Sequence, residues 1–576
     1  MRMRPTSATM ASSIAAHRLH MSGRSNLAKC LQKVHNFCHR RVGTTAVPVR
    51  ADVPRKDENS EKDGRLSFYA VQAHRQEQAE RSVLINCHPK TNERNIPKLL
   101  SLHGEIKKYF IYESYGTYAV VEFSSQDSVS SLLEEATVPS NNHESMVPYK
   151  SRLLTLRGLT EVTNQQSSKQ SHPQTTIPIN ELIQRLSQDE SIDQQIISLT
   201  EAYQLTEENS RLRFLVCSLL KDIAAAYFPE CAIKPFGSTV NGFGKLGCDL
   251  DMFLDLDDVS GRNLKTPKSG LTLEYQMKQA TSERAATQSI LSVIGECIDQ
   301  FGPGCVGVQK ILNARCPLVR FAHQPSGFQC DLTANNRVAM KSSELLYLYG
   351  QLDPRVRHLV FTVRCWARAH GVTSSIPGAW ITNFSVTVMV LFFLQGRSPS
   401  IIPTLDHLRD LAGPADKSVI EGNDCTFVSD FDRIQFRSNT ETLEKLLCEF
   451  FEFYATFAFS KKSINIRKGK EQNKPETSPL HIQNPFETTL NVSKNVNGTQ
   501  LERFVALCQE SAWLLQQSDT IAPKGGRTPT PWGLATLLLP TQVAGVKSRK
   551  KRKREPASER IKSLLESLKN KNQPKS

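Results

Sequence analysis

The sequence has no long apolar run, no closely spaced pair of cysteines and no secretory leader. Its longest uninterrupted apolar stretch, Val388 to Leu394, is well short of the roughly 18 to 20 residues that a membrane-spanning helix needs. The fourteen cysteines are scattered without a C-x-x-C pair, so neither a zinc site nor a disulfide framework is indicated. These absences argue against a membrane span and favour a reducing compartment.

Acidic residues are missing from the first 51 residues, which contain nine Lys or Arg. A long acid-free start rich in Arg, Ser and Ala is typical of a mitochondrial transit peptide; the alternative is a basic arm that binds RNA. Near the other end, the run Lys547 to Arg554 is interpreted as an RNA-contacting tail, with a nuclear signal as the rival interpretation. The two ends carry +9 each of the total of +15, so the body is at −3, and phosphate attraction must come from local patches or from the tails.

The front of the chain alternates between strand and helix patterns. Strands are expected at 82–87, 106–113, 118–123 and 153–156, and helices at 95–102 and 128–135. This βαββαβ order resembles an RNA-recognition motif. Tyr118 falls on an aromatic position of the third strand, but Val120 takes the other stacking position and offers no π-face to a base. The module is therefore expected to form a homodimer, with RNA binding as the alternative.

The candidate catalytic residues lie in two segments that follow a helical stretch. The first is the turn Phe236-Gly237-Ser238, and the second is the alternating segment Asp249-Leu250-Asp251. On a strand, carboxylates two residues apart share a face, where they repel each other unless a cation lies between them. Oxygen ligands with open positions suit Mg²⁺, which also binds substrate phosphates.

Together these segments resemble the hG[G/S]…Dh[D/E]h pattern of the DNA polymerase β-like nucleotidyltransferases. The resemblance implies that Gly237 and Ser238 hold the triphosphate and that Asp249 and Asp251 bind two ions, Mg²⁺ or Mn²⁺. It also implies a third carboxylate on a later strand, which Asp331 supplies within the segment 328–333. All three acids would serve in-line transfer of a nucleotide from a nucleoside triphosphate.

Further motifs resemble the poly(A) and poly(U) polymerase group of these enzymes, over about residues 200 to 515. In that group an Asn after the third Asp contacts the ribose, and two lysines four apart lie near the triphosphate. A Ser-Tyr pair meets the triphosphate and the base. The matching positions here are Asn335 or Asn336 for the ribose, Arg364 and Arg368 for the lysines, and Asn383 and Phe384 for the Ser-Tyr pair. Phe384 can still stack on a base.

One position bears on the choice of base. Uridylyltransferases of this group tend to carry His directly before the Asn that follows Pro-Phe-Glu, and here Leu490 precedes Asn491. A leucine cannot donate a hydrogen bond to uracil, so adenylation is favoured. The resemblance therefore implies a template-independent enzyme that uses ATP to extend RNA 3′ ends in mitochondria. Alternatives are a terminal uridylyltransferase, an oligoadenylating enzyme, and an inactive RNA-binding scaffold, against which the three acids argue.

The expected fold class is α+β and multidomain. It combines a polymerase-β-like palm, a helical central and poly(A)-polymerase-associated domain, and the N-terminal module that resembles an RNA-recognition motif. Helices at the start of the palm segment are allowed to pack on the helical domain. The expected boundaries are a transit peptide at 1–51, the module at 65–157, a linker at 160–176, the palm at 177–340, the helical domain at 341–520 and a basic, largely disordered tail at 521–576.

Overall fold

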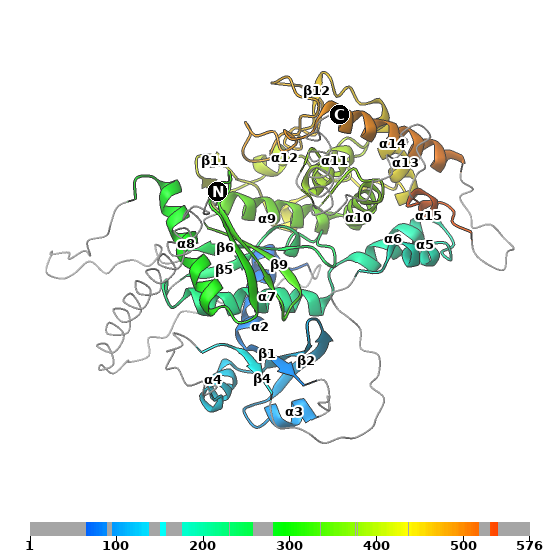
Figure 1. Cartoon of the computed structure of the whole chain (residues 1–576). Helices are drawn as coiled ribbons and strands as arrows, with labels where there is room; N and C mark the ends of the chain where they lie inside the picture. Colours follow the sequence, from blue (N-terminus) through cyan, green and yellow to red (C-terminus); the bar gives the residue numbers. More distant parts are fainter. Residues whose placement is uncertain are drawn as a thin grey trace, which may run out of the picture.

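The structure is a computed structural model that describes residues 65–88, 95–137, 150–156, 176–229, 231–256, 280–334, 336–374, 376, 378–435, 437–517 and 530–539. The transit peptide expected at 1–51, the linker apart from its last residue, the basic run from Lys547 and the site residue Asn335 lie outside the described residues. The described chain forms an N-terminal module, a palm built on a sheet, and a helical lobe (Figure 1).

The N-terminal module is a four-stranded sheet in the order β2-β3-β1-β4. Alternating side chains of β1 and β3, including Val83 and Val121, pack against Ile96 of α3 and Val129 of α4. The expected strands and helices lie within two residues of their places, whereas α2 was not expected from the sequence. The elements are α2 (Phe68–Glu80), β1 (Ser82–Cys87), α3 (Asn95–Leu100), β2 (Ile106–Glu113), β3 (Thr117–Phe123), α4 (Gln126–Glu135) and β4 (Leu153–Thr155).

The direction of β4 departs from the RNA-recognition-motif prediction. In a βαββαβ unit, the second crossover makes the last strand parallel to the third and antiparallel to the first. Here β4 pairs parallel with β1, with Leu84 opposite Leu153. Alternation along a strand indicates its place in the sequence but not its direction, so the sequence could not reveal this difference.

The second face of the module's sheet is covered by the palm. Leu84, Tyr112, Tyr118 and Val120 belong to one apolar cluster with residues of α7 such as Leu212. Tyr118 is only 7% exposed and Tyr112 is completely buried. Stacking of RNA bases on this face, the alternative expected for this sheet, is wrong because the palm already covers it. The expected homodimer was not assigned to a face and stays a prediction.

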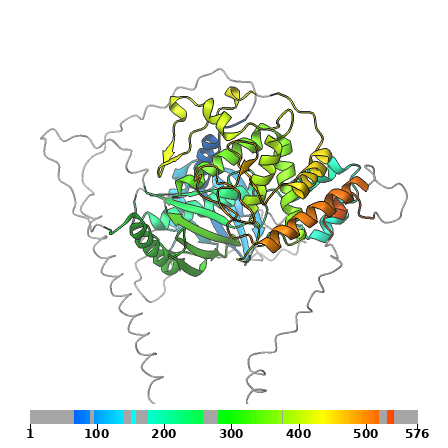
Figure 2. The ribbon, with the colours of Figure 1, turned by 90° about the horizontal axis from the view of Figure 1, so that it is seen from above.

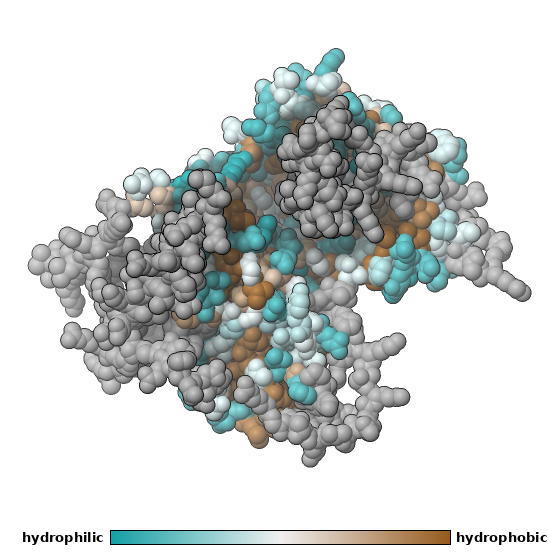
Figure 3. Space-filling model, in the orientation of Figure 1, coloured by the Kyte–Doolittle hydropathy of each residue, from teal (hydrophilic) through white to brown (hydrophobic). Residues whose placement is uncertain are grey.

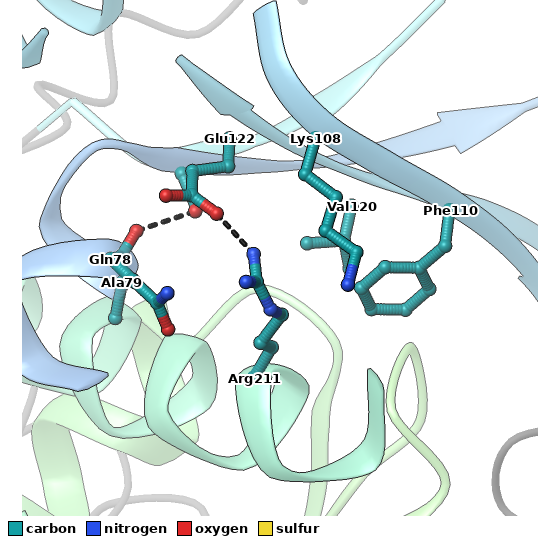
Figure 4. Close-up of a pocket in the computed structure, with 8 residues that line it drawn as sticks. Gln78, Ala79, Lys108, Phe110, Val120, Glu122 and Arg211 are labelled. Atoms are coloured by element: carbon teal, nitrogen blue, oxygen red, sulfur yellow. Dashed lines mark hydrogen bonds and ion pairs between the residues drawn. The ribbon is translucent and has the colours of Figure 1, made fainter. Parts of the chain in front are cut away.

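A polar network surrounds this apolar contact. Glu122 of β3 is buried and accepts hydrogen bonds from Arg81, at 3.0 and 2.9 Å, and from Arg211 of α7. Figure 4 shows the Glu122 and Arg211 side chains pointing toward each other beside Lys108 and Phe110 of β2. A buried carboxylate is tolerated when cations satisfy its oxygens, so this network fixes how the module sits on α7.

The palm is a five-stranded mixed sheet in the order β5-β6-β9-β8-β7, in which only the β6–β9 pair is parallel. Leu250, Met252 and Leu254 of β6 share an apolar cluster with residues of α7 and α8. Both helices therefore cover one face of the sheet. The elements are α7 (Glu207–Ala224), β5 (Ala232–Pro235), η2 (Gly237–Thr239), β6 (Leu250–Asp255), α8 (Glu283–Phe301), β7 (Cys305–Ile311), β8 (Leu318–His323) and β9 (Phe328–Ala334).

The helical lobe has one large core around the buried Trp366. Helices α5 and α6 precede the palm in sequence but pack here, as the sequence analysis allowed. Helix α11 is buried on nearly all sides, which explains the longest apolar run. The helices are α5 (Ile179–Leu186), α6 (Ile192–Tyr203), α9 (Arg337–Leu352), α10 (Pro354–Ala369), α11 (Asn383–Gln395), α12 (Leu405–Asp410), α13 (Leu443–Thr456), α14 (Gly498–Gln517) and α15 (Leu534–Leu537).

Short elements complete the lobe. They are the strand pairs β10 (Val419–Ile420) with β11 (Asn423–Asp424) and β12 (Lys462–Ser463) with β13 (Gln472–Asn473), and the 3-10 turns η4 (Pro414–Asp416) and η5 (Phe431–Arg433). From above, the palm and the helical lobe lie side by side (Figure 2).

Residues 530–539 correct the expected start of the basic tail. The Trp532 indole donates to the Ser187 carbonyl at 3.2 Å, and the Leu534 amide donates to the Gln195 side chain at 2.7 Å. Leu534 and Leu538 are fully buried. The apolar residues of this segment need a partner surface, and α5 and α6 provide it, so this part of 521–576 is an ordered piece of the helical lobe.

The visible surface carries a mixture of polar and apolar side chains (Figure 3). On the visible face, apolar side chains lie in separate patches among polar ones (Figure 3). Within the part of the chain that the structure describes, no helix combines the length and the apolarity needed to cross a membrane.

Candidate active site

Two of the three expected acids face each other across neighbouring strands. Asp251 of β6 and Asp331 of β9 are direct partners in the parallel register. Because Leu250 and Met252 point into the palm core, the alternation of a strand directs Asp251, and Asp249 just before β6, to the opposite face. The structure thus gathers the three acids on the face that α7 and α8 leave open.

The electrostatics of this face are those of crowded carboxylates. Burial, followed by the charges of Asp331 and Asp249, raises the pKa of Asp251 from 3.8 to about 7. Burial and the charge of Asp331 also raise the pKa of Asp249. Arg213 and Arg320 oppose these shifts without cancelling them. The site therefore has an unmet demand for positive charge, which is the demand that a divalent cation satisfies.

Asp331 is held by an arginine from the next strand. Arg320 of β8 donates to both of its carboxylate oxygens, at 2.8 and 2.6 Å. Within the described ranges, no three Asp, Glu, His or Cys side chains are placed to hold one metal ion as they stand. The donor set fits Mg²⁺ or Mn²⁺ chemically, while in this structure the Asp331 carboxylate is paired with Arg320.

The Gly-Ser turn lies directly against the acids. Gly237 has φ +63°, and a Cβ at this position would lie 3.1 Å from Asp251 Oδ2, so both the backbone conformation and the available space favour glycine. The Gly237 amide donates to Ser343 Oγ of α9 at 2.8 Å. The Ser238 hydroxyl donates to Cys248 Sγ at 3.3 Å. Phe236, the third expected residue of this turn, packs edge-on against Phe253 with 6.3 Å between ring centroids.

The expected pair of cations lies on α10 beside the loop that joins the turn to β6. Arg364 donates to the Phe243 carbonyl at 2.8 Å, whereas Arg368 is exposed one turn further along. Lys245 is electrostatically coupled to this pair. Burial lowers the pKa of Lys245, and the charges of Arg368 and Arg364 lower it further. These three cations near the Gly-Ser turn form a local positive patch, whereas the chain without its two basic ends is slightly acidic overall.

The remaining expected residues lie in or next to the helical lobe. Asn383 is exposed in the first turn of α11, and Phe384 is half-buried against the lobe core. Leu490 is half-buried, and its amide donates to the Glu487 carbonyl at 2.9 Å. Asn336, just before α9, approaches Cys316 of the palm with its amide nitrogen 3.9 Å from the sulfur.

The residues expected from the sequence did not include Arg213, Arg320 and Ser343, which contact the acids or the turn. They also did not include Lys245, whose pKa is lowered by the charges of the cation pair. Arginine or serine within a helix or strand pattern ordinarily indicates a solvent-exposed position, so their types gave no signal. Arg320 could have been found from its place on the strand next to β9, once the register was known.

The palm, the Gly-Ser turn and the three acids define a nucleotidyltransferase. Family models agree: residues 192–351 match "Poly(A) RNA polymerase, mitochondrial-like, central palm domain", residues 67–137 match "RL domain", and residues 442–490 match "Cid1 family poly A polymerase". The N-terminal module is thus matched as an RL domain, and the α+β palm expected from the sequence is confirmed.

Known proteins extend this match over most of the chain. The mitochondrial poly(A) RNA polymerases of Mus musculus and Homo sapiens are each 58% identical, over 87% of this chain and 86% of their own length. The crystal structure of mtPAP in its apo form shares 56% identity with a TM-score of 0.78, covering 83% of this chain and 100% of that one. The structure of mtPAP with ATPγS has a TM-score of 0.77 at the same identity and coverage. The chain belongs to the mitochondrial poly(A) RNA polymerase family.

Proposed function

We propose that this chain is a template-independent RNA 3′-end adenylyltransferase, which converts ATP and RNA into an RNA with a poly(A) tail and pyrophosphate. The observation that carries the proposal is the register of Asp251 opposite Asp331, with Asp249 and Gly237 beside them. Relatives named mitochondrial poly(A) RNA polymerase, which are similar over most of both chains, support the same activity.

The proposed ligands of two Mg²⁺ or Mn²⁺ ions are Asp249, Asp251 and Asp331. The raised pKa values of Asp249 and Asp251 mark a site that favours bound positive charge. When bound, such ions lower the pKa of the RNA 3′-hydroxyl and neutralise the leaving pyrophosphate. The protein's own part is to hold the three carboxylates on one sheet face and to position the two reactants in line.

The proposed triphosphate site combines the turn Gly237–Thr239 with the patch formed by Lys245, Arg364 and Arg368. Backbone amides and a serine hydroxyl at such a turn suit phosphate oxygens, and arginine adds forked donors. We assign the phosphate contact to Gly237 and Ser238, whose amide and hydroxyl donate to Ser343 and Cys248 in this structure. Asn335 and Asn336 are proposed to contact the ribose.

Base recognition is assigned to Asn383, Phe384 and Leu490. Phe384 offers a ring for stacking, and Leu490 offers an apolar wall where a hydrogen-bonding histidine would favour uracil. The neighbour of Leu490 is firmly held, because Asn491 Oδ1 accepts from the amides of Ile482 and Ser493 at 3.1 and 2.9 Å. A fixed backbone at this point gives residue 490 a defined position from which to select a base.

The test is extension of a labelled RNA primer by the purified chain with each of ATP, UTP, CTP and GTP. We expect long tails with ATP alone. The double variant Asp249→Ala/Asp251→Ala, checked for folding by its melting temperature, is expected to be inactive. A preference for UTP would overturn the base assignment, and extension by the double variant would overturn the metal site.

We also propose a mitochondrial matrix location, with residues 1–51 as the transit peptide, which agrees with the names of the mitochondrial relatives. The alternative is nuclear entry through Lys547 to Arg554. Fusing residues 1–51 to a fluorescent protein tests the transit peptide. Nuclear localisation of the full chain that is lost when Lys547–Arg554 are replaced would support the nuclear alternative.

For the N-terminal module we propose an RRM-like ancestry and a homodimer contact at β2, the edge strand of the sheet. Tyr109 on this strand is 43% exposed, and an open edge readily pairs with a second chain. Deleting the module would uncover the palm core, so Tyr109→Pro is the better test. Light scattering should show a dimer that becomes a monomer, and an unchanged mass would contradict the contact.

A further inference from the structure

Arg213 is a cation buried in the middle of α7, with an exposed fraction of 0%. Burying an arginine is costly unless its donors are satisfied. Its bonded partners in the described part of the chain are neutral groups and include no carboxylate. Nε donates to Asn209 Oδ1 at 2.8 Å, Nη1 donates to Thr239 Oγ1 and to the Asp249 carbonyl, both at 3.0 Å, and Nη2 donates to the Cys248 carbonyl at 2.6 Å.

These partners belong to separate parts of the active site. Thr239 ends the Gly-Ser turn, while Cys248 and Asp249 form the approach to β6. The guanidinium also lies over the ring of Phe328, with its carbon 4.6 Å from the ring centroid. Phe328 begins β9, three residues before Asp331. One side chain therefore touches the phosphate turn, the segment of the first acid and the strand of the third acid.

The geometry uses features that only arginine has. Two nitrogens of one rigid plane bind two consecutive carbonyls, while a third nitrogen anchors the plane to the helix. Holding the carbonyls of Cys248 and Asp249 fixes the peptide planes on either side of the Asp249 Cα, and with them the direction of its carboxylate. A lysine offers a single charged nitrogen and cannot make the three sets of bonds together.

We propose that Arg213 is a positioning residue for nucleotidyl transfer, whose buried guanidinium fixes the turn 237–239, the Asp249 segment and the start of β9 relative to one another. The inference rests on the active site proposed above. Because a displacement of about 1 Å in a catalytic arrangement can cost about 100-fold in rate, the expected effect of disturbing Arg213 falls on kcat. Arg213 is completely buried and cannot itself contact the RNA primer, so binding of the primer should change little.

The experiment compares Arg213→Lys with Arg355→Lys in the full chain, by melting temperature and by kcat and KM for primer extension with ATP. Arg355 is the control because it lies in the helical lobe and also bonds an amide oxygen and a carbonyl, those of Asn439 and Glu441 at 3.0 and 2.8 Å. Unlike Arg213, it also pairs with a carboxylate, that of Asp353 at 2.7 Å. We expect Arg213→Lys to lose about 100-fold in kcat with KM for RNA within about threefold of wild type. Arg355→Lys should keep its kcat even where its melting temperature falls as much.

Thr239→Val provides a second variant if Arg213→Lys does not fold. It removes one hydrogen bond between Arg213 and the turn while keeping the side-chain shape, and kcat should fall about tenfold. If Arg213→Lys folds, a kcat within about threefold of wild type would overturn the proposal. If only Thr239→Val folds, the same result in that variant would overturn it. So would equal kcat losses in Arg213→Lys and Arg355→Lys. Wild-type protein that extends no primer, or an active Asp249→Ala/Asp251→Ala protein in the same assay, would instead contradict the active site itself.

Discussion

Arg320 and Asp331 occupy paired positions on β8 and β9, and the guanidinium donates to both oxygens of the carboxylate at 2.8 and 2.6 Å. The arginine is 46% exposed and the aspartate 16% exposed. The same carboxylate is proposed to bind a metal ion, so arginine and ion compete for its oxygens. Arg320 thus supplies positive charge that the ion has to replace.

Replacing Arg320 with Met should therefore reduce the Mg²⁺ concentration needed for half-maximal primer extension. Because the pair is partly exposed to solvent, its contribution is modest and the shift should be about threefold. The measurement is the initial rate as a function of Mg²⁺ at saturating ATP and RNA. An unchanged or higher Mg²⁺ requirement would show that the arginine does not compete with the ion.

Asp251→Asn should stabilise the metal-free protein at neutral to alkaline pH. The folded pKa of Asp251 is raised from 3.8 to about 7, mainly by burial. A carboxyl group with a raised pKa costs stability as the pH rises from its unfolded towards its folded value, and the full cost remains above that value. With a chelator present, the variant should melt higher than wild type at pH 8 and equally at pH 3. A lower melting temperature at pH 8 would contradict the raised pKa.

Glu207→Gln should destabilise the contact between the N-terminal module and the palm in a pH-dependent way. Hydrogen bonds from Arg75 and then from Arg211 lower the pKa of Glu207 from 4.5 to about 2. Stability from a lowered carboxyl pKa is fully present above the unfolded value of 4.5 and is lost as the pH falls towards 2. Wild type and variant should differ in melting temperature at pH 7 and converge near pH 2. Glu208→Gln, which leaves Glu207 and both arginines in place, is the control.

Tyr112→Phe should weaken the same contact without affecting catalysis. The Tyr112 hydroxyl is buried and donates to the Pro325 carbonyl at 2.8 Å. Its loss leaves that carbonyl unpaired and should cost about 1 to 3 kcal/mol. Urea titration measures the change, and kcat should stay at the wild-type value. Tyr115→Phe, at a position 76% exposed, should leave the urea midpoint unchanged.

Leu490→His should move the nucleotide preference towards UTP. A histidine can donate to uracil where leucine only provides an apolar wall, and one such contact changes discrimination by roughly tenfold or more. The ratio of kcat/KM for UTP to that for ATP should rise by about this factor. If the ratio stays constant, base selection depends on other residues, with Asn383 the next position to test.

The sequence was sufficient wherever residue type or a local motif carried the signal. The strands at 82–87, 106–113 and 117–123 are short runs rich in β-branched and aromatic residues, and the Gly-Ser turn with its Asp-x-Asp segment indicated the palm. Helix α2 was missed because its sequence is polar with little apolar periodicity, and its stability comes from packing on α7. Local propensity gave no sign of a helix that depends on a distant surface.

The sequence also could not predict features that depend on contacts between residues distant in the chain. The third strand of the module indicated that its sheet lacks one stacking residue, but nothing in it showed that α7 covers that face. Arg213 and Arg320 act through the register of strands and helices far from them in the chain. The asparagine and arginine assignments around the nucleotide remain predictions that the experiments above address.

The helical lobe is discontinuous in sequence, with α5 and α6 before the palm and the other helices after it. The palm is thus an insertion connected to the lobe at two points, between α6 and α7 and between β9 and α9. Two connections resist twisting and sliding of one body against the other, which leaves rotation about the line through both as the easiest motion. The three acids, which lie on the palm, are therefore expected to move relative to α10 and α11 of the lobe chiefly by this rotation.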